Sequence, residues 1–67
     1  MNNYTKPNRI LRMPEVMRTT GLARSTIYLK LSQGEFPTSV KLGERAIGWL
    51  EADVQDWIEE KILQNGV

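Results

Sequence analysis

Polar and apolar residues follow a helical period in the first part of the chain, where a glycine separates two short segments. The first segment, residues 13–20, carries Pro14 and Glu15 at its start and is followed by Gly21. Proline is tolerated in the first helical turn because its missing amide hydrogen would have no acceptor there, and an acidic residue suits the helix dipole. Glycine readily adopts the positive φ that ends many helices. We therefore predict a helix over residues 13–20.

A second helix is expected over about residues 24–33. Ile27 and Leu31 lie one turn apart and face a core together with Leu22, and Gly34 ends the segment. Only about three residues separate the two helices. A turn of that length containing glycine is typical of a helix-turn-helix, whose second helix lies in the major groove of DNA.

The pattern changes after residues 36–37, where Phe-Pro breaks helical geometry. Residues 38–42 alternate polar and apolar, and residues 46–50 can return as an antiparallel partner across a short loop that contains glycine. A last helix is expected over residues 51–64. Its apolar residues at helical spacing are Val54, Trp57, Ile58 and Ile62. The aromatic residues that we expect in the core are Phe36, Trp49 and Trp57.

The order helix, helix, hairpin, helix predicts a mainly α fold with a small β-hairpin, the winged helix-turn-helix. Residues 1–9 are polar and show no period, so we expect a flexible N-terminal arm. Residues 10–64 are the predicted DNA-binding domain, with the recognition helix at about 24–33 and the wing at about 38–50. A chain of 67 residues leaves room for one such domain.

Composition narrows the classes of function. The chain contains no cysteine and no histidine, which removes thiol nucleophiles, thiolate metal sites and the commonest general base near neutral pH. We therefore expect a binding module rather than an enzyme, with no cofactor and no metal. No apolar run approaches the roughly 20 residues that cross a bilayer, and the polar start lacks a signal-peptide core. We expect no membrane contact and a cytoplasmic, nucleoid-associated location.

Basic and acidic residues are unevenly distributed. Residues 1–50 hold eight bases and three acids, a net charge of +5, whereas residues 51–67 hold one base and five acids, a net charge of −4. This division suggests that the first part faces a polyanion and that the last helix faces away from it. The acidic cluster lacks metal-binding spacing, and the helix dipole and solvation explain it.

A rotation of about 100° per residue separates the two faces of the second helix and places Ser25 and Leu29 about 160° from Ile27. Hydroxyl and basic side chains on this outer face suit base edges and phosphates. Two bases at or near the hairpin tip can reach a phosphate or the adjacent minor groove. The candidate DNA-binding residues are Arg24, Ser25, Thr26, Tyr28, Lys30, Lys41 and Arg45.

Some of these residues have a second interpretation. Leu29, at the centre of the outer face, either contacts a thymine methyl group or packs against a neighbouring protomer. Ser25 or Thr26 can instead cap the first turn of the helix. Three bases near the start of the chain form either a trailing basic arm or ordinary surface charge: Lys6, Arg9 and Arg12.

The chain resembles the AlpA family of prophage regulators over roughly residues 9–63. The matching blocks are residues 11–16, 20–28, 34–37 and 40–50, followed by Val54, Trp57 and Ile58. The resemblance implies a small MerR-like or excisionase-like winged helix-turn-helix. It also implies DNA contacts by Arg24, Ser25, Thr26, Tyr28 and the wing residue Arg45. Ala23 departs from the family, which usually has serine there, and the missing N-cap should cost roughly 0.5–2 kcal/mol of helix stability.

The function that follows is a sequence-specific DNA-binding transcriptional regulator of a prophage or integrative element. One alternative is an excisionase, or recombination directionality factor, that bends DNA. Another is a protein-interaction module that keeps the fold without binding DNA. The expected partner is double-stranded DNA, with self-association on DNA and an integrase as further candidate partners.

Overall fold

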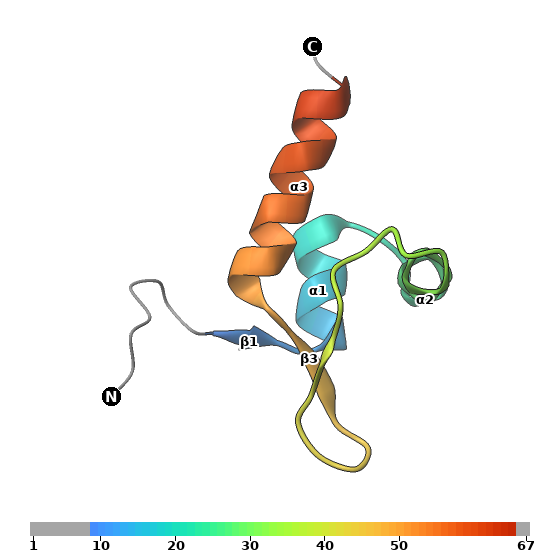
Figure 1. Ribbon diagram of the computed structural model, residues 1–67, viewed down its shortest axis with the longest axis vertical. Coiled ribbons are helices and arrows are strands. Elements are labelled where there is room, and N and C mark those ends of the chain that lie inside the picture. The colour runs from blue at the N-terminus through green and yellow to red at the C-terminus, as the bar shows by residue number, and fades with distance from the viewer. Residues whose placement is uncertain (1–8, 66–67) are drawn as a thin grey trace.

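A computed structural model describes residues 9–65, which form three helices and three short strands (Figure 1). The helices are α1 (Met13–Thr20), α2 (Arg24–Ser32) and α3 (Glu51–Asn65). The strands β1 (Ile10–Leu11), β2 (Val40–Lys41) and β3 (Ile47–Leu50) form an antiparallel sheet in the order β1-β3-β2. The predicted mainly α fold with a hairpin is confirmed: α1 and α2 form the helix-turn-helix, and β2 and β3 form the wing.

The sheet differs from the predicted two-stranded hairpin in one respect. Strand β1 pairs with the other edge of β3, so that Ile10 lies opposite Leu50 and Leu11 opposite Trp49. Two residues are too few to show an alternating pattern, which is why the sequence did not reveal this strand. Residues 1–8 of the predicted arm lie outside the described residues.

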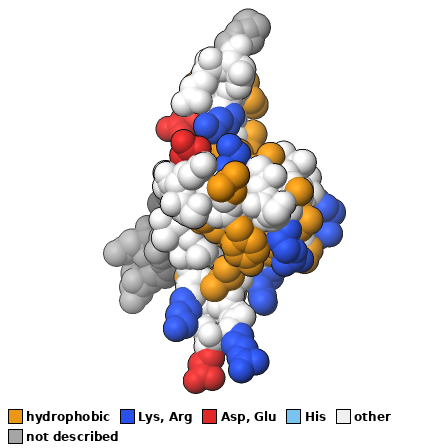
Figure 2. Space-filling view, turned by 90° about the vertical axis from the view of Figure 1, so that its right-hand side faces the viewer, with side chains coloured by type: hydrophobic (Ala, Val, Ile, Leu, Met, Phe, Trp, Pro, Cys, Tyr) orange, Lys and Arg blue, Asp and Glu red, His pale blue; other side chains and the backbone are white. Residues whose placement is uncertain are grey.

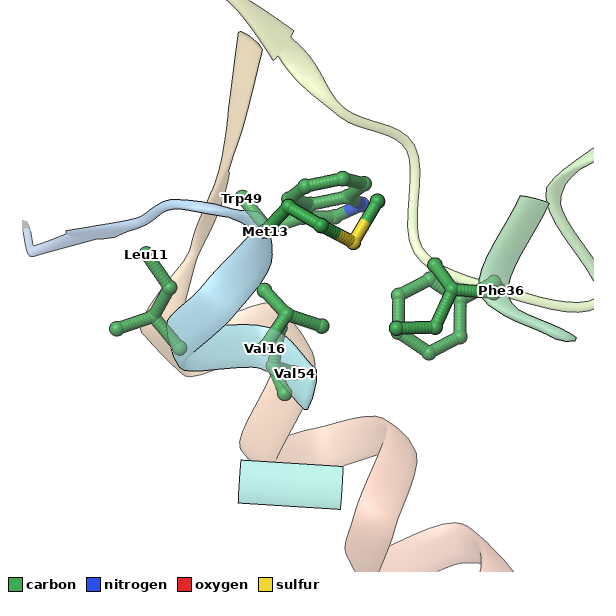
Figure 3. Packing of buried hydrophobic residues seen from close by; sticks show 7 residues of the cluster. Leu11, Met13, Val16, Phe36, Trp49 and Val54 are labelled. Carbon is green, nitrogen blue, oxygen red and sulfur yellow. The ribbon is translucent and has the colours of Figure 1, made fainter. Parts of the chain in front are cut away.

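One small core draws on all three helices and on the sheet. Its most deeply buried side chains are Val16 of α1, Ile27 of α2, Trp49 of β3 and Val54 of α3, each 0% exposed. Figure 3 labels six of the buried side chains: five gather where α1, α3 and the sheet meet, and Phe36 lies to one side on the segment that follows α2. The complete set is Leu11, Met13, Val16, Ile27, Phe36, Trp49 and Val54. Because every element supplies at least one buried side chain except β2, the core fixes the helix-turn-helix and β3 together.

Phe36 joins the connection between α2 and β2 to this core. Its ring lies 4.9 Å from that of Trp57, tilted by 59°, and 6.3 Å from that of Trp49 at 81°, an edge-on contact. The indole N–H of Trp57 donates to the carbonyl of Glu35 at 2.9 Å, and that of Trp49 donates to the carbonyl of Pro37 at 3.0 Å. The predicted core role of the three aromatic residues is confirmed, with Trp57 half-buried.

The C-terminal half of α3 extends beyond the rest of the structure (Figure 1). Ile62, the last of the apolar residues at helical spacing in this helix, is 62% exposed. The helix outruns the α1–α2 unit against which its first half packs, so residues beyond Ile58 find few partners. Among residues 9–65, no helix combines the length and apolarity that crossing a bilayer requires.

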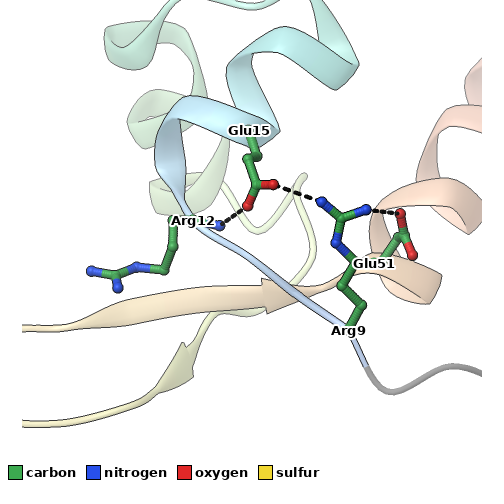
Figure 4. Close-up of polar contacts among 4 residues, drawn as sticks. All are labelled: Arg9, Arg12, Glu15 and Glu51. Carbon is green, nitrogen blue, oxygen red and sulfur yellow. Dashed lines mark hydrogen bonds and ion pairs between the residues drawn. The ribbon is translucent and has the colours of Figure 1, made fainter.

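Arg9 ties the start of the described chain to both α1 and α3 (Figure 4). Its guanidinium lies 2.7 Å from a carboxylate oxygen of Glu15 and 3.5 Å from one of Glu51. Glu15 also accepts a hydrogen bond from the backbone N–H of Arg12 at 3.3 Å. The hydrogen bond from Arg12, together with the nearby Arg9, holds the pKa of Glu15 below its ordinary 4.5. This cluster fastens β1 beside the two helices.

Gly48 of β3 has no room for a side chain between β1 and the end of the hairpin's other arm. A Cβ atom on this residue would collide with Cγ2 of Ile10 and would lie 3.1 Å from the carbonyl oxygen of Leu11 and 3.2 Å from Cδ1 of Leu42. We predict that Gly48→Ala lowers the free energy of unfolding by about 1–3 kcal/mol, because the strands on both sides must shift. Urea denaturation followed by circular dichroism measures this change.

Gly43→Ala is the matched control for that substitution. A Cβ atom on Gly43 would lie 3.9 Å from the Cβ of Ala46, an ordinary contact. We expect a change within about 0.5 kcal/mol, as for most surface positions. Equal losses in the two variants would contradict the close packing of β3 against Ile10.

Candidate nucleic-acid interface

The turn that precedes α2 is shaped by Thr20 and Gly21. The Thr20 hydroxyl donates to the carbonyl of Val16 at 2.8 Å and accepts from the backbone N–H of Leu22 at 3.2 Å. Gly21 adopts φ 76°, and its N–H donates to the Met17 carbonyl at 2.8 Å, which closes α1. A left-handed residue at this place reverses the chain at little conformational cost only if it is glycine. The turn therefore sets where α2 begins.

Glycine also ends α2, in a Schellman motif. Gly34 has φ 71°, and its N–H donates to the Leu31 carbonyl at 3.1 Å. The N–H of Glu35 donates to the Lys30 carbonyl at 2.8 Å. These two bonds satisfy carbonyls at the helix end that would otherwise lack a partner. The two glycines thus set where α2 begins and ends. The helix between them is nine residues long, about 13 Å at 1.5 Å per residue.

Helix α2 buries only one narrow side. Ile27 is 0% exposed, and Leu31 packs half-buried against the same core. Ser25 is exposed about 160° from Ile27, and Arg24 and Tyr28 are exposed on one flank, about 60° and 100° from it, Tyr28 by 48%. The remaining two predicted contacts on the helix, Thr26 and Lys30, are half-buried on the other flank. The five helical candidates therefore lie around most of the helix surface outside the strip buried by Ile27, and three of them are exposed: Arg24, Ser25 and Tyr28.

The wing carries the other two candidates. Lys41 is exposed on β2, and Arg45 is exposed in the bend of residues 43–45 at the hairpin tip. Two backbone hydrogen bonds close the bend, from the N–H groups of Leu42 and Gly43 to the carbonyl of Ala46 at 2.7 and 3.2 Å. Within residues 9–65, both ion pairs belong to Arg9, so no acidic side chain in that range neutralises Lys41 or Arg45.

The predicted basic arm is only partly described. Arg9 is taken up by Glu15 and Glu51 on the side of the molecule formed by β1, α1 and α3, and Arg12 is exposed at the start of α1. Lys6 lies outside the described residues. A contact of Arg9 with DNA would require breaking two ion pairs.

Figure 2 looks at the molecule from the side on which α2 lies in Figure 1. Lys and Arg side chains border an apolar area on this face, and acidic side chains appear mainly toward the α3 end and at one extremity of the hairpin. Sequence reasoning missed part of this apolar surface. Val40 and Leu42, expected on the buried side of a strand, are 37% and 45% exposed because β2 is an edge strand of only two residues. The short length of the alternating segment was the sequence feature that could have indicated this exposure.

The first turn of α2 is uncapped. Ala23 is the N-cap, with the extended φ −72° and ψ 156° that this position requires, and has no side-chain acceptor to offer. The starting point of the helix predicted from the sequence is confirmed. Ser25 and Thr26 lie inside the helix, and no side-chain hydrogen bond from either to another residue in 9–65 occurs.

The chain is similar in sequence to known proteins. The profile of the family described as prophage CP4-57 regulatory protein (AlpA) matches residues 9–62. The uncharacterized protein ORF88 of Enterobacteria phage P4 is 48% identical over 54 residues. That alignment covers 81% of this chain and 61% of the phage protein, so the chain spans less than two thirds of this relative. The DNA-binding transcriptional activator AlpA of Escherichia coli (strain K12) is 39% identical over 67 residues, covering 91% of this chain and 94% of the relative.

The missing cap gives a testable consequence. We predict that Ala23→Thr raises the free energy of unfolding by about 0.5–2 kcal/mol relative to Ala23→Val, a side chain of nearly the same shape without an acceptor oxygen. The threonine hydroxyl would accept from a free N–H in the first turn of α2. Urea denaturation of the two variants measures the difference, and equal stabilities would mean that these N–H groups gain nothing from a cap.

Proposed function

The chain belongs to the AlpA family of prophage regulatory proteins, and from this premise we propose that it is a sequence-specific DNA-binding regulator of transcription in a prophage or integrative element. The observation that carries the proposal is the exposure of Arg24, Ser25 and Tyr28 in the N-terminal half of α2, a helix that the buried Ile27 holds against the core. A relative of 39% identity bears the name DNA-binding transcriptional activator, which supports the same reading.

We place α2 in the major groove. The groove is about 12 Å wide and admits one helix, whose first turns contact base edges. The N-terminal half of α2 supplies the guanidinium of Arg24 and the hydroxyls of Ser25 and Tyr28. A guanidinium pairs with guanine O6 and N7, whereas hydroxyls bond either bases or phosphates. These three residues are the proposed readers, with Thr26 and Lys30 directed to the backbone at the flanks.

The wing extends the contact along the duplex. Lys41 and Arg45 are exposed on the hairpin, and basic side chains there favour phosphates or the adjacent minor groove. The hairpin and α2 are joined by residues 33–39, which the two indole N–H groups attach to the core. This attachment supports a fixed spacing between the groove contact and the backbone contact. A single short helix reads few base pairs, so we further propose that copies of the chain bind side by side on DNA.

The proposal predicts a phosphate contact by Arg45. Arg45→Ala should weaken binding to all duplexes about equally and reduce the slope of log affinity against log salt by about one unit, because one released counterion is lost. Fluorescence anisotropy with a duplex from the element's own promoter region, repeated at several salt concentrations, measures both effects. Arg45→Lys, which keeps the charge, is the control and should retain the slope.

Two other outcomes of this experiment would be decisive. A change in the preferred sequence on Arg45→Ala would assign the wing to base recognition instead of to a phosphate. Absence of binding to every duplex, even at low salt, would overturn the proposed function and favour a protein-interaction module.

The proposal also predicts that Ser25 and Tyr28 contribute to selectivity. Ser25→Ala and Tyr28→Ala should each lower the preference for the specific site over random DNA by about 0.5–1.5 kcal/mol, the range of a single hydrogen bond. Both side chains are exposed, so thermal unfolding should be almost unchanged. Competition binding against random duplex measures the preference, and a loss of folded protein in its place would identify the two residues as structural.

A further inference from the structure

We propose that Leu29 reads the 5-methyl group of a thymine in the major groove and thereby sets part of the sequence preference. The inference rests on the proposed DNA-binding function and adds to it a specific chemical group on the duplex. It concerns a residue that neither the fold nor the hydrogen-bonding contacts of α2 explain.

Leu29 lies on the outermost line of α2. It is 56% exposed and stands one turn after Ser25 and almost one turn before Ser32, both exposed. Ile27, two residues earlier, is 0% exposed on the opposite side. Leu29 is absent from the apolar cluster that surrounds the core, to which Leu31 belongs. The fold therefore gains little from a leucine at this position.

The surroundings of Leu29 favour DNA as the occupant. Lys30 is its neighbour on α2, Arg24 begins the same helix, and the hairpin adds Lys41 and Arg45. No acidic side chain within residues 9–65 pairs with any of these four. Figure 2 shows basic side chains bordering an apolar area on this face. An apolar centre with a basic border complements the major groove, where phosphates line the edges and the floor presents base edges.

The exposed apolar residues of α3 provide the contrast. Ile62 and Leu63 are 62% and 78% exposed, but they belong to a helix whose part of the chain carries a net charge of −4. This negative charge repels the phosphates of a duplex, so an exposed leucine on α3 is not expected to contact DNA as Leu29 on α2 is. Exposure of an apolar residue is therefore not enough to indicate a contact with a base. The residue must also lie among basic side chains, as Leu29 does.

The chemistry of the groove identifies the group. Base pairs present nitrogen and oxygen donors and acceptors there, and thymine adds an apolar methyl at C5. A leucine side chain has no hydrogen-bonding atom, so it cannot pair with the donors and acceptors of any base, and the thymine methyl is the apolar group in the groove that it can contact. Against thymine it buries the methyl group instead. Burial of one such group corresponds to about fourfold in affinity.

Deoxyuridine tests the proposal because it removes the methyl group and keeps base pairing. The preferred site is first selected from a pool of randomised duplexes with the full chain. Each thymine of that site is then replaced singly by deoxyuridine, and binding is measured by anisotropy for the native chain, Leu29→Ala and Leu63→Ala. Leu63→Ala is the matched control, since it shortens an exposed leucine on α3. Circular dichroism verifies that the variants fold, and lower salt brings weak complexes into the measurable range.

The proposal expects one thymine whose replacement weakens the native chain and Leu63→Ala about fourfold, while Leu29→Ala binds both duplexes equally. It is overturned if no thymine shows the effect or if Leu29→Ala keeps the same ratio. A change in the number of bound copies with an unaltered ratio would assign Leu29 to a neighbouring protomer and would also overturn it. If selection recovers no site and no duplex binds at low salt, the proposed function itself fails, an outcome distinct from the others.

Discussion

The contact of Phe36 with two tryptophans is the constraint on which the rest of this small structure depends. Its ring packs on Trp57 of α3 and meets Trp49 of β3 edge-on. Both indole N–H groups donate to carbonyls directly beside it, those of Glu35 and Pro37. Aromatic pairs of this kind contribute beyond their buried area, and the paired N–H groups avoid the penalty of unsatisfied donors. The segment between α2 and the wing is therefore held at three adjacent residues.

That attachment matters because α2 and β2, the elements proposed to face DNA, have little core of their own. Helix α2 contributes one fully buried residue, Ile27, and β2 contributes none. Their positions come from what lies at their ends: the turn at Gly21, the Schellman motif at Gly34 and the aromatic contact that follows. Because contacts at the ends of these elements fix their positions, their exposed side chains contribute little to folding. Substitutions there can change recognition with small effects on folding.

The sequence predicted the helices and the wing because each has a local signal. Gly21 and Gly34 mark helix ends through their positive φ, and Ile27 with Leu31 marks the buried side of α2. Features that depend on distant partners could not be predicted. The ion pair of Arg9 with Glu51 joins residues 42 apart in the chain, and β1 is too short to have a period. Ile62 has core-like spacing, and its exposure follows only from where α1 and α2 end against α3. The seven candidate contacts were chosen by residue type, but which five of them are exposed, and that Thr26 and Lys30 are half-buried, required the fold.

The arrangement of ion pairs adds a consequence for electrostatics that net charge conceals. The chain carries only +1 overall, yet Arg9 is neutralised by Glu15 and Glu51 at the edge of the sheet where β1 meets α1 and α3. Bases on α2 and on the wing have no such partner within residues 9–65. The acidic residues concentrate on α3, whose far end projects away from the rest of the structure (Figure 1). A molecule with these separated charges turns in the field of a polyanion so that α2 and the wing face it and α3 points away.

This orienting effect acts before any base contact forms. Salt weakens it, because charges in solution are screened beyond the Debye length, which is about 8 Å at physiological ionic strength. Under the proposed function, selectivity then comes from contacts with base edges, by Arg24 and by the uncharged groups of α2, because basic residues that contact only phosphates attract every duplex alike.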